Sequence, residues 1–230
     1  MNRTTIIIAL ALVALLGLGA AFGGLFSVSS ATSEQAASNE ETDAQAAEPE
    51  AAADLPPVEE MTLGDANAPV KVVEYSSYTC PHCAAFHVDS FDKLKAEYID
   101  TGKVHFTYRE VYFDRIGLWA SMIARCGGSE KFFGINDLIH KGQRDWLGDG
   151  DPVKIADGLR KIGRVAGLDA DAIDACLEDE ASAQSLVAWF QKNGDEDEIK
   201  STPSFVVDGE LIAGNNYAKL KEAIDAALGE

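Results

Sequence analysis

The motif Cys80-Pro81-His82-Cys83, at a predicted strand-to-helix junction, constrains the fold of this chain more than any other feature. Before it, Val70–Tyr75 is a short run of β-branched and aromatic residues, which is typical of a strand. Met61–Leu63 and Val104–Tyr108 are two further predicted strands. After the motif, apolar residues recur at the spacing of one helix face: Val88, Phe91, Leu94 and Tyr98. Two cysteines at such a junction form a candidate redox pair if a second strand-rich half follows.

A second, strand-rich half is predicted near the end of the chain. Ser204–Val207 and Leu211–Ile212 are predicted strands, and Asp208-Gly209 between them favours a two-residue hairpin. Tyr217–Leu228 follows as an amphipathic helix. The order of elements is therefore β-α-β, then helices, then β-β-α.

Residues 116–193, between the two halves, are predicted to be helical throughout. Pro152 is suited to a first helical turn and Asp169 to an N-cap. We therefore expect an α/β domain formed by residues 61–115 and 194–230, with an all-helical domain inserted between these two parts.

Residues 1–30 are typical of a segment that exports a chain. Arg3 precedes the uncharged stretch Thr4–Phe26, which is apolar and long enough to span a bilayer. Ser29-Ser30-Ala31 offers small residues for cleavage, so a cleaved signal peptide and a retained membrane anchor both remain open. In either case Arg3 stays inside and the rest of the chain crosses the membrane, which places it in the periplasm.

Residues 31–60 are rich in Ala, Glu, Ser, Gln and Pro and contain no Lys or Arg. Such a segment cannot bury enough apolar surface to offset its ordering entropy, so we expect a disordered acidic linker. The whole chain carries a net charge of -19, which argues against nucleic-acid binding because the phosphates would be repelled. We expect a monomer without a cofactor.

The chemistry of the motif depends on the Cys80 sulfur. At the start of a helix it would face unpaired N–H groups and the positive end of the helix dipole. Pro81 fits the first turn, and His82 adds a donor or a partial positive charge. These effects favour the thiolate, the form that attacks disulfides, while Cys83 would be the shielded resolving thiol. A pKa lowered by about three units corresponds to roughly 4 kcal/mol. That makes the Cys80–Cys83 disulfide more oxidising by about 90 mV.

Two other interpretations of the motif remain. Cys80 and Cys83 could bind zinc together with His82 or His87, or they could form an inert structural disulfide. There is no second C-x-x-C, and consecutive residues at a helix start do not converge tetrahedrally. We therefore favour a redox pair and expect no metal.

Several features together resemble the DsbA family. They are the Cys80–Cys83 motif, Glu74 six residues before it, and Thr202-Pro203-Ser204-Phe205 just before the Asp208-Gly209 hairpin. The resemblance covers about residues 61–230. It implies a thioredoxin-like fold with an inserted all-helical domain.

The resemblance also implies roles for individual residues. Pro203 would be cis and face the active site, and Thr202 would offer its backbone to an extended peptide. Glu74 lies in an apolar strand, where a carboxylate is costly unless paired, and would accept a proton from Cys83. The alternative is an acid that points to solvent. Relatives often place a lysine on the neighbouring strand, but here that position is predicted to be Tyr108.

The remaining cysteines, Cys126 and Cys176, fall on predicted helices fifty residues apart, where some relatives are similar in carrying a second pair. A bridge there would stabilise the fold by about 4 kcal/mol. We expect a structural disulfide; two buried free thiols, or a pair that tunes the active site, are the alternatives.

Other aromatic and histidine side chains are given no chemical role. Tyr78 is expected to flank a substrate groove. Residues interpreted as surface or rim histidines are His87, His105 and His140. Residues expected in the core are Trp119, Trp146 and Trp189.

The resemblance implies a periplasmic thiol-disulfide oxidoreductase that donates its disulfide to cysteines of unfolded exported proteins. A quinone-linked membrane partner, similar to DsbB, would reoxidise it. One alternative is a reductase or isomerase of the same fold, although isomerases usually need a dimerisation module, and none is predicted here. The other is a non-catalytic peptide-binding or assembly factor that uses the same groove.

Overall fold

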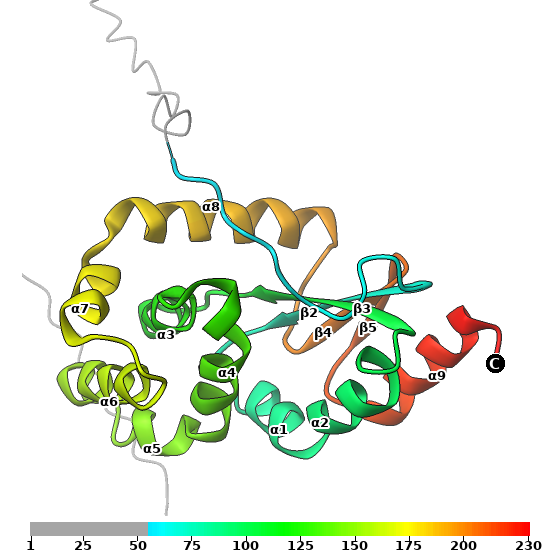
Figure 1. The fold of residues 1–230 in the computed structure, drawn as a ribbon, viewed down its shortest axis with the longest axis horizontal. Helices are drawn as coiled ribbons and strands as arrows, with labels where there is room; N and C mark the ends of the chain where they lie inside the picture. Colours follow the sequence, from blue (N-terminus) through cyan, green and yellow to red (C-terminus); the bar gives the residue numbers. More distant parts are fainter. Residues whose placement is uncertain (1–54) are drawn as a thin grey trace, which may run out of the picture. The chain divides into compact units, whose positions relative to one another are not determined.

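A computed structural model describes residues 55–230 (Figure 1). The predicted export segment 1–30 and residues 31–54 of the predicted linker lie outside the described residues. Within residues 55–230, no helix combines the length and the apolar character that a membrane span needs.

A five-stranded sheet lies at the centre of the fold, and both halves of the chain contribute to it. Its strands, in spatial order, are β1 (Met61–Leu63), β3 (Val104–Glu110), β2 (Val70–Ser76), β4 (Ser204–Val207) and β5 (Glu210–Ala213). β2 and β3 are parallel, and the other neighbours are antiparallel. β2 of the first half pairs with β4 of the second, with Tyr75 opposite Ser204. The predicted strands are confirmed, and the hairpin turn occupies Asp208 and Gly209.

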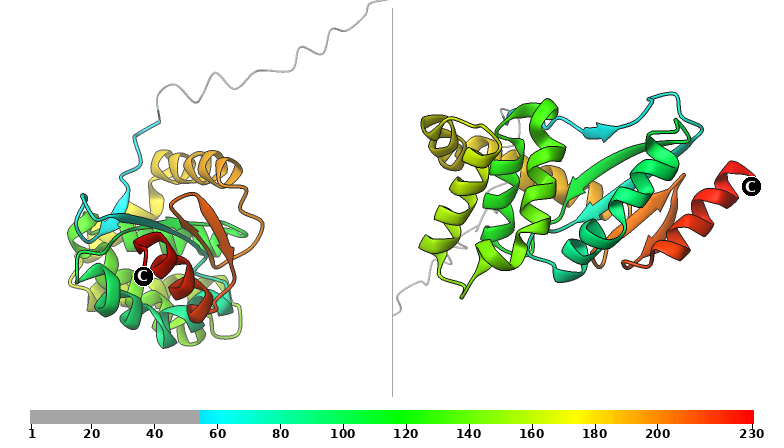
Figure 2. Two further views of the ribbon diagram at one scale, coloured as in Figure 1. Left: turned by 90° about the vertical axis from the view of Figure 1, so that its right-hand side faces the viewer. Right: turned by 60° about the horizontal axis from the view of Figure 1, so that its bottom comes forward.

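Helices surround the sheet and fill the interval between its halves. They are α1 (Pro81–Asp89), α2 (Phe91–Leu94), the π-helical turn η2 (Lys95–Ile99), α3 (Arg115–Arg125), α4 (Gly128–Lys141), α5 (Gln143–Leu147), α6 (Pro152–Val165), α7 (Ala170–Glu178), α8 (Glu180–Glu196) and α9 (Tyr217–Leu228). Figures 1 and 2 show α1, α2 and α9 on one face of the sheet and α8 on the other.

Local signals set several helix starts as predicted. Pro152 stands in the first turn of α6, and the Asp169 side chain accepts a hydrogen bond from the backbone N–H of Asp171 at the start of α7. The single helix expected after the motif is instead broken at Ser90, which separates α1 from α2. As a result Val88, expected on the buried face, is 53% exposed.

One hydrophobic core runs from the sheet into the helical insertion. Val72 and Phe106 of the sheet belong to the same buried cluster as Phe132 and Ile135 of α4 and Ile155 of α6. The insertion therefore has no separate core among the described residues, and its helices are stabilised by the same buried surface as the sheet.

The opposite face of the sheet is covered by α8. Tyr75 and Val206 form a small buried cluster there, against which Phe190 of α8 packs. α8 continues to Glu196, beyond residue 193 where the insertion was predicted to end. The last turns of α8 thus belong to the layer that covers the sheet.

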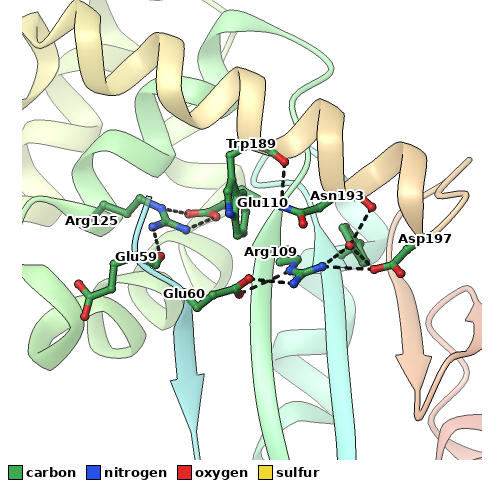
Figure 3. Close-up of polar contacts among 9 residues, drawn as sticks. Glu59, Glu60, Arg109, Glu110, Arg125, Trp189, Asn193 and Asp197 are labelled. Carbon is green, nitrogen blue, oxygen red and sulfur yellow. Dashed lines mark hydrogen bonds and ion pairs between the residues drawn. The ribbon is translucent and has the colours of Figure 1, made fainter. Parts of the chain in front are cut away.

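Two arginines form ion pairs on this face of the sheet (Figure 3). Arg125 of α3 forms two hydrogen bonds to buried Glu110, at 2.7 Å and 2.6 Å. Arg109 of β3 pairs with Asp197 at 3.3 Å. The Trp189 ring of α8 lies 5.5 Å from one guanidinium carbon and 5.6 Å from the other. Trp189, expected in the core, is therefore a half-buried ring between two cations.

The same arginines bind the segment just before β1. Arg109 bonds the Glu60 carboxylate at 2.8 Å, and Arg125 bonds the Glu59 carbonyl at 2.8 Å (Figure 3). The Ser185 hydroxyl of α8 donates to the Pro56 carbonyl at 2.8 Å. Residues 56–60, which were predicted to be part of a disordered linker, are instead held against the folded domain. Composition predicted disorder because it did not show these partners, which lie far away in sequence.

The second cysteine pair joins two helices of the insertion. The Sγ atoms of Cys126, at the end of α3, and Cys176, in α7, are 2.04 Å apart across a sequence separation of 50 residues. Both cysteines are partly exposed rather than buried.

Replacing both Cys126 and Cys176 with serine should lower the free energy of unfolding by about 4 kcal/mol, because a loop of this length is then free in the unfolded chain. Urea titration measures this loss, with Cys80→Ser/Cys83→Ser as the control that keeps the second pair. Alkylation of the unfolded, unreduced protein followed by mass spectrometry should leave Cys126 and Cys176 unmodified. Two modified residues at these positions would contradict the bridge.

Candidate active site

The first cysteine of the motif is the N-cap of α1. Cys80 has an extended backbone, with φ -81° and ψ 120°, and Pro81 follows in the first helical turn. The sulfur is partly exposed and the thiol is not bonded to another cysteine. The helix start predicted for the motif is therefore confirmed.

Several donors stabilise the anion of Cys80. The nearby Cys83 thiol, the Thr202 side chain and the backbone N–H groups of Cys83 and His82 lower the pKa of Cys80 to about 5, whereas burial raises it. The Cys80 side chain forms no capping hydrogen bond at the start of α1. The exposed His82 acts through its backbone N–H, whereas the sequence had suggested its imidazole.

The second cysteine is shielded. Cys83 is fully buried one turn into α1, and its sulfur accepts a hydrogen bond from the backbone N–H of Ser77 at 3.4 Å. Burial, and then the neighbouring Cys80, raise the pKa of the Cys83 thiol well above its ordinary value. The reduced pair at neutral pH is therefore one thiolate, Cys80, and one thiol, Cys83.

The loop before β4 faces this pair. The Thr202–Pro203 peptide bond is cis, as the resemblance implied. Cys80 Sγ lies 3.4 Å from the Thr202 carbonyl oxygen, to which it donates a hydrogen bond when it is protonated. Because Ser204 begins β4 opposite Tyr75 of β2, the strand pairing places this loop beside the motif.

Residues distant in sequence from the motif bind it and the loop before it. The Gln143 side chain, in α5, donates to the carbonyl oxygens of Tyr78 at 2.8 Å and Cys80 at 2.9 Å. Thr79 donates to Asp114, the N-cap of α3, at 2.8 Å. Gln143 was not predicted from the sequence, since a lone glutamine sixty residues from the motif gives no pattern. Its side chain connects the helical insertion directly to the active-site loop.

Tyr78 was expected to flank a substrate groove, but it does not. It is buried, and its hydroxyl donates to the side chain of Asn136 in α4 at 2.8 Å. The exposed aromatic residue in this region is Phe113, which is 62% exposed and precedes Asp114. The apolar character of Tyr78 is used inside the fold, where its ring contacts Tyr108.

Glu74 lies beneath the motif and is fully buried. Its carboxylate is 2.9 Å from Nε2 of His87, on α1, so it does not point to solvent. Tyr108 stands opposite Glu74 on β3, at the position where relatives were expected to have a lysine. The partner of Glu74 is thus a histidine from the helix rather than a cation from the strand.

Two histidines predicted at the surface are instead buried. His87 and His140 are almost fully excluded from solvent, and only His105 keeps partial exposure. Their burial depends on α4 folding over α1, which no local pattern reveals. Among residues 55–230, no group of three or more His, Cys, Asp or Glu side chains is placed to hold a metal ion.

A family model described as thioredoxin matches residues 57–226. The chain belongs to the thioredoxin family. The match covers the sheet and nearly all of the helices, including those of the insertion.

Relatives within this family carry related names. A putative protein-disulfide oxidoreductase of Rickettsia bellii is 34% identical over 172 residues, which are 74% of this chain and 65% of that protein. Disulfide bond formation protein D of Bacillus subtilis is 26% identical over 174 residues, 72% of this chain and 76% of that protein. This chain thus spans less than two thirds of the length of the Rickettsia protein.

The crystal structure of Wolbachia pipientis alpha-DsbA1 has a TM-score of 0.69 to this structure at 28% identity. The match covers 76% of this chain and 94% of that chain. These comparisons confirm the thioredoxin-like fold with a helical insertion and the resemblance to DsbA-like proteins.

The thiolate absorbance of the reduced protein should titrate with a midpoint near pH 5, the pKa of Cys80. Cys83→Ala should move that midpoint upward, because it removes the largest contribution to the lowered pKa. Cys83→Ser keeps a hydroxyl donor and should move it less. Cys80→Ser, the control, should abolish the transition.

The same titration predicts how stability depends on pH. The pKa of Cys80 is lower in the folded state than its ordinary value of about 8.5. Relative to the oxidised form, the reduced form should therefore become more stable as pH rises from about 5 to about 8.5. It should lose this advantage as pH falls through 5. Equal pH dependence of the two forms in urea titrations would contradict the assignment.

Proposed function

We propose that this protein is a thiol-disulfide oxidoreductase that donates the Cys80–Cys83 disulfide to cysteines of unfolded exported proteins. The observation that supports this most directly is the partly exposed Cys80 sulfur, whose pKa is lowered to about 5 at the start of α1. A protein that stabilises its own thiolate favours its reduced form, so its disulfide is readily given away.

The reaction proceeds by two exchanges. A client thiolate attacks Cys80 Sγ of the disulfide, a client–Cys80 bond forms, and Cys83 leaves as a thiolate that takes up one proton. A second client thiolate then attacks the client sulfur of this mixed disulfide. The client disulfide forms and Cys80 leaves as a thiolate. The client is oxidised by two electrons, and the protein is reduced to one thiolate and one thiol.

Each part of the site has a role in this scheme. The Ser77 N–H, 3.4 Å from Cys83 Sγ, stabilises the leaving thiolate before it is protonated. The cis Thr202–Pro203 loop, in contact with Cys80, offers its backbone to an extended client segment, as in β-augmentation. Buried Glu74 is the proton acceptor beneath Cys83 when the pair is oxidised again.

Reoxidation requires a partner that carries a disulfide. We assign this role to a quinone-linked membrane protein of the DsbB type. The apolar segment Thr4–Phe26 would export the chain to the periplasm, as a cleaved signal or as an anchor. The protein would act as a monomer, and the Cys126–Cys176 bridge would be structural.

The proposal is tested with Cys83→Ala whose Cys80 has been converted to a mixed disulfide with thionitrobenzoate. A peptide with one cysteine should displace the coloured thiol and remain bound to Cys80. A peptide with two cysteines should leave as a disulfide and free Cys80. Cys80→Ala, treated in the same way, is the control and should trap nothing.

The direction of transfer is tested by equilibration with glutathione and by insulin reduction. Donation predicts a redox potential more oxidising than that of the reductase thioredoxin, which is about -270 mV. A potential at or below that value, with rapid insulin reduction, would instead favour a reductase. No adduct in the trapping experiment would exclude both activities.

A further inference from the structure

Four buried titratable side chains from four elements lie together in the core. Glu74 on β2 contacts His87 on α1 at 2.9 Å, and Tyr108 on β3 contacts His140 on α4 at 2.8 Å. The two imidazole rings connect these pairs, with centroids 4.0 Å apart and planes 7° from parallel. All four side chains are almost fully buried.

We propose that His87, together with Glu74, accepts and holds the proton which Cys83 loses when it closes the active-site disulfide. This inference rests on the proposed oxidoreductase function, and it gives Glu74 the partner His87 where the resemblance implied a lysine. His140 remains neutral, so the cluster of Glu74, His87 and His140 takes up a single proton.

The position of His87 is set by the helix that carries the motif. His87 follows Cys83 by four residues in α1, so the two side chains share one helix face, with Cβ atoms about 5–6 Å apart. Both are fully buried. The buried Cys83 thiol and the buried His87 ring are therefore neighbours on the inner face of α1, one turn apart.

The charge of Glu74 requires such a partner. A buried carboxylate is costly unless it is paired or protonated. Oε1 of Glu74 contacts Nε2 of His87, while Oε2 has no hydrogen-bond partner among the described residues. The pair can hold its proton on the imidazole or on the carboxyl group, and this single bond connects the two states.

Within residues 55–230, the other titratable groups packed around His87 and His140 are poor proton acceptors. Burial raises the pKa of Tyr108 and of Tyr78, which lies against His140, so both phenols stay neutral. Burial, and then the nearby His87, lower the pKa of His140 well below its ordinary value. Two stacked imidazolium ions would repel each other at this distance, so only one ring can be charged.

His140 lines a cleft of about 440 Å³ between α1 and the α4–α5 region, together with Pro81 and Arg144. Its ring is nevertheless almost fully excluded from solvent, and its Nδ1 has no hydrogen-bond partner among the described residues.

The active-site disulfide closes by one thiol–disulfide exchange. Cys80 begins in a mixed disulfide with a partner sulfur. The Cys83 thiol gives its proton to the pair of Glu74 and His87, and its sulfur attacks Cys80 Sγ. The Cys80–Cys83 bond forms, the bond to the partner breaks, and the partner sulfur leaves as a thiolate with the electron pair.

The test uses the reduced protein and oxidised glutathione, with acid quenching and mass spectrometry at successive times. The first step, attack by Cys80, adds one glutathione; the second, attack by Cys83, removes it. His87→Gln keeps a donor for Glu74 but cannot take up a proton. It should leave the first step unchanged and slow the second about tenfold or more at pH 7.

The pH profile separates proton transfer from a structural effect. In His87→Gln the second step should rise nearly tenfold per pH unit around neutrality, because only the ionised fraction of Cys83 reacts; the wild-type profile should be flatter. His105→Gln, a change on β3 outside the cluster, is the control and should follow the wild-type protein in both steps.

A second variant keeps the test valid if His87→Gln fails to fold. Glu74→Gln should make the pH profile of the second step steeper, as His87→Gln does. In this step Glu74→Gln/His87→Gln should be little slower than the slower single variant, because both residues serve one proton. A second step with the wild-type pH profile in either single variant would overturn this inference. Failure of wild-type protein to form the glutathione adduct would instead overturn the proposed function.

Discussion

The pairing of β2 with β4 is the constraint on which the rest of this structure depends. β2 delivers Cys80 to the start of α1, and β4 begins at Ser204, directly after the cis Thr202–Pro203 bond. About 120 residues separate these segments in sequence, so only the ladder in which Tyr75 lies opposite Ser204 places them in contact. The helices between them must therefore return the chain to this register.

The two sulfurs of the motif lie in different environments. Cys80 lies at the edge of the fold, where thiol, hydroxyl and backbone donors stabilise a negative charge. Cys83, one helical turn away, lies where burial opposes charge. The difference between the two cysteines therefore arises from depth and from the direction of the helix, and not from a change in residue type. The contact between His87, on the same helix, and Glu74 is likewise fully buried.

Features coded by local pattern could be predicted from the sequence, and features that depend on tertiary contact could not. The strands, the hairpin at Asp208-Gly209 and the start of α6 at Pro152 follow from alternation, turn residues and capping. The burial of His87 and the reach of Gln143 into the motif follow from how α4 and α5 fold back, which leaves no trace in spacing. The redox pair was found because its two members are close in sequence, whereas the residues that surround it are not.

The single core shared by the sheet and the insertion limits how this protein can be divided. Phe132 and Ile135 on α4 are buried in the same cluster as Val72 and Phe106 in the sheet. A chimera that exchanged the helices with those of a relative would leave mismatched volumes on both sides of that boundary. Recombination between such proteins should therefore retain the helices together with the strand residues that they cover, and residues of the two parts should vary jointly among relatives.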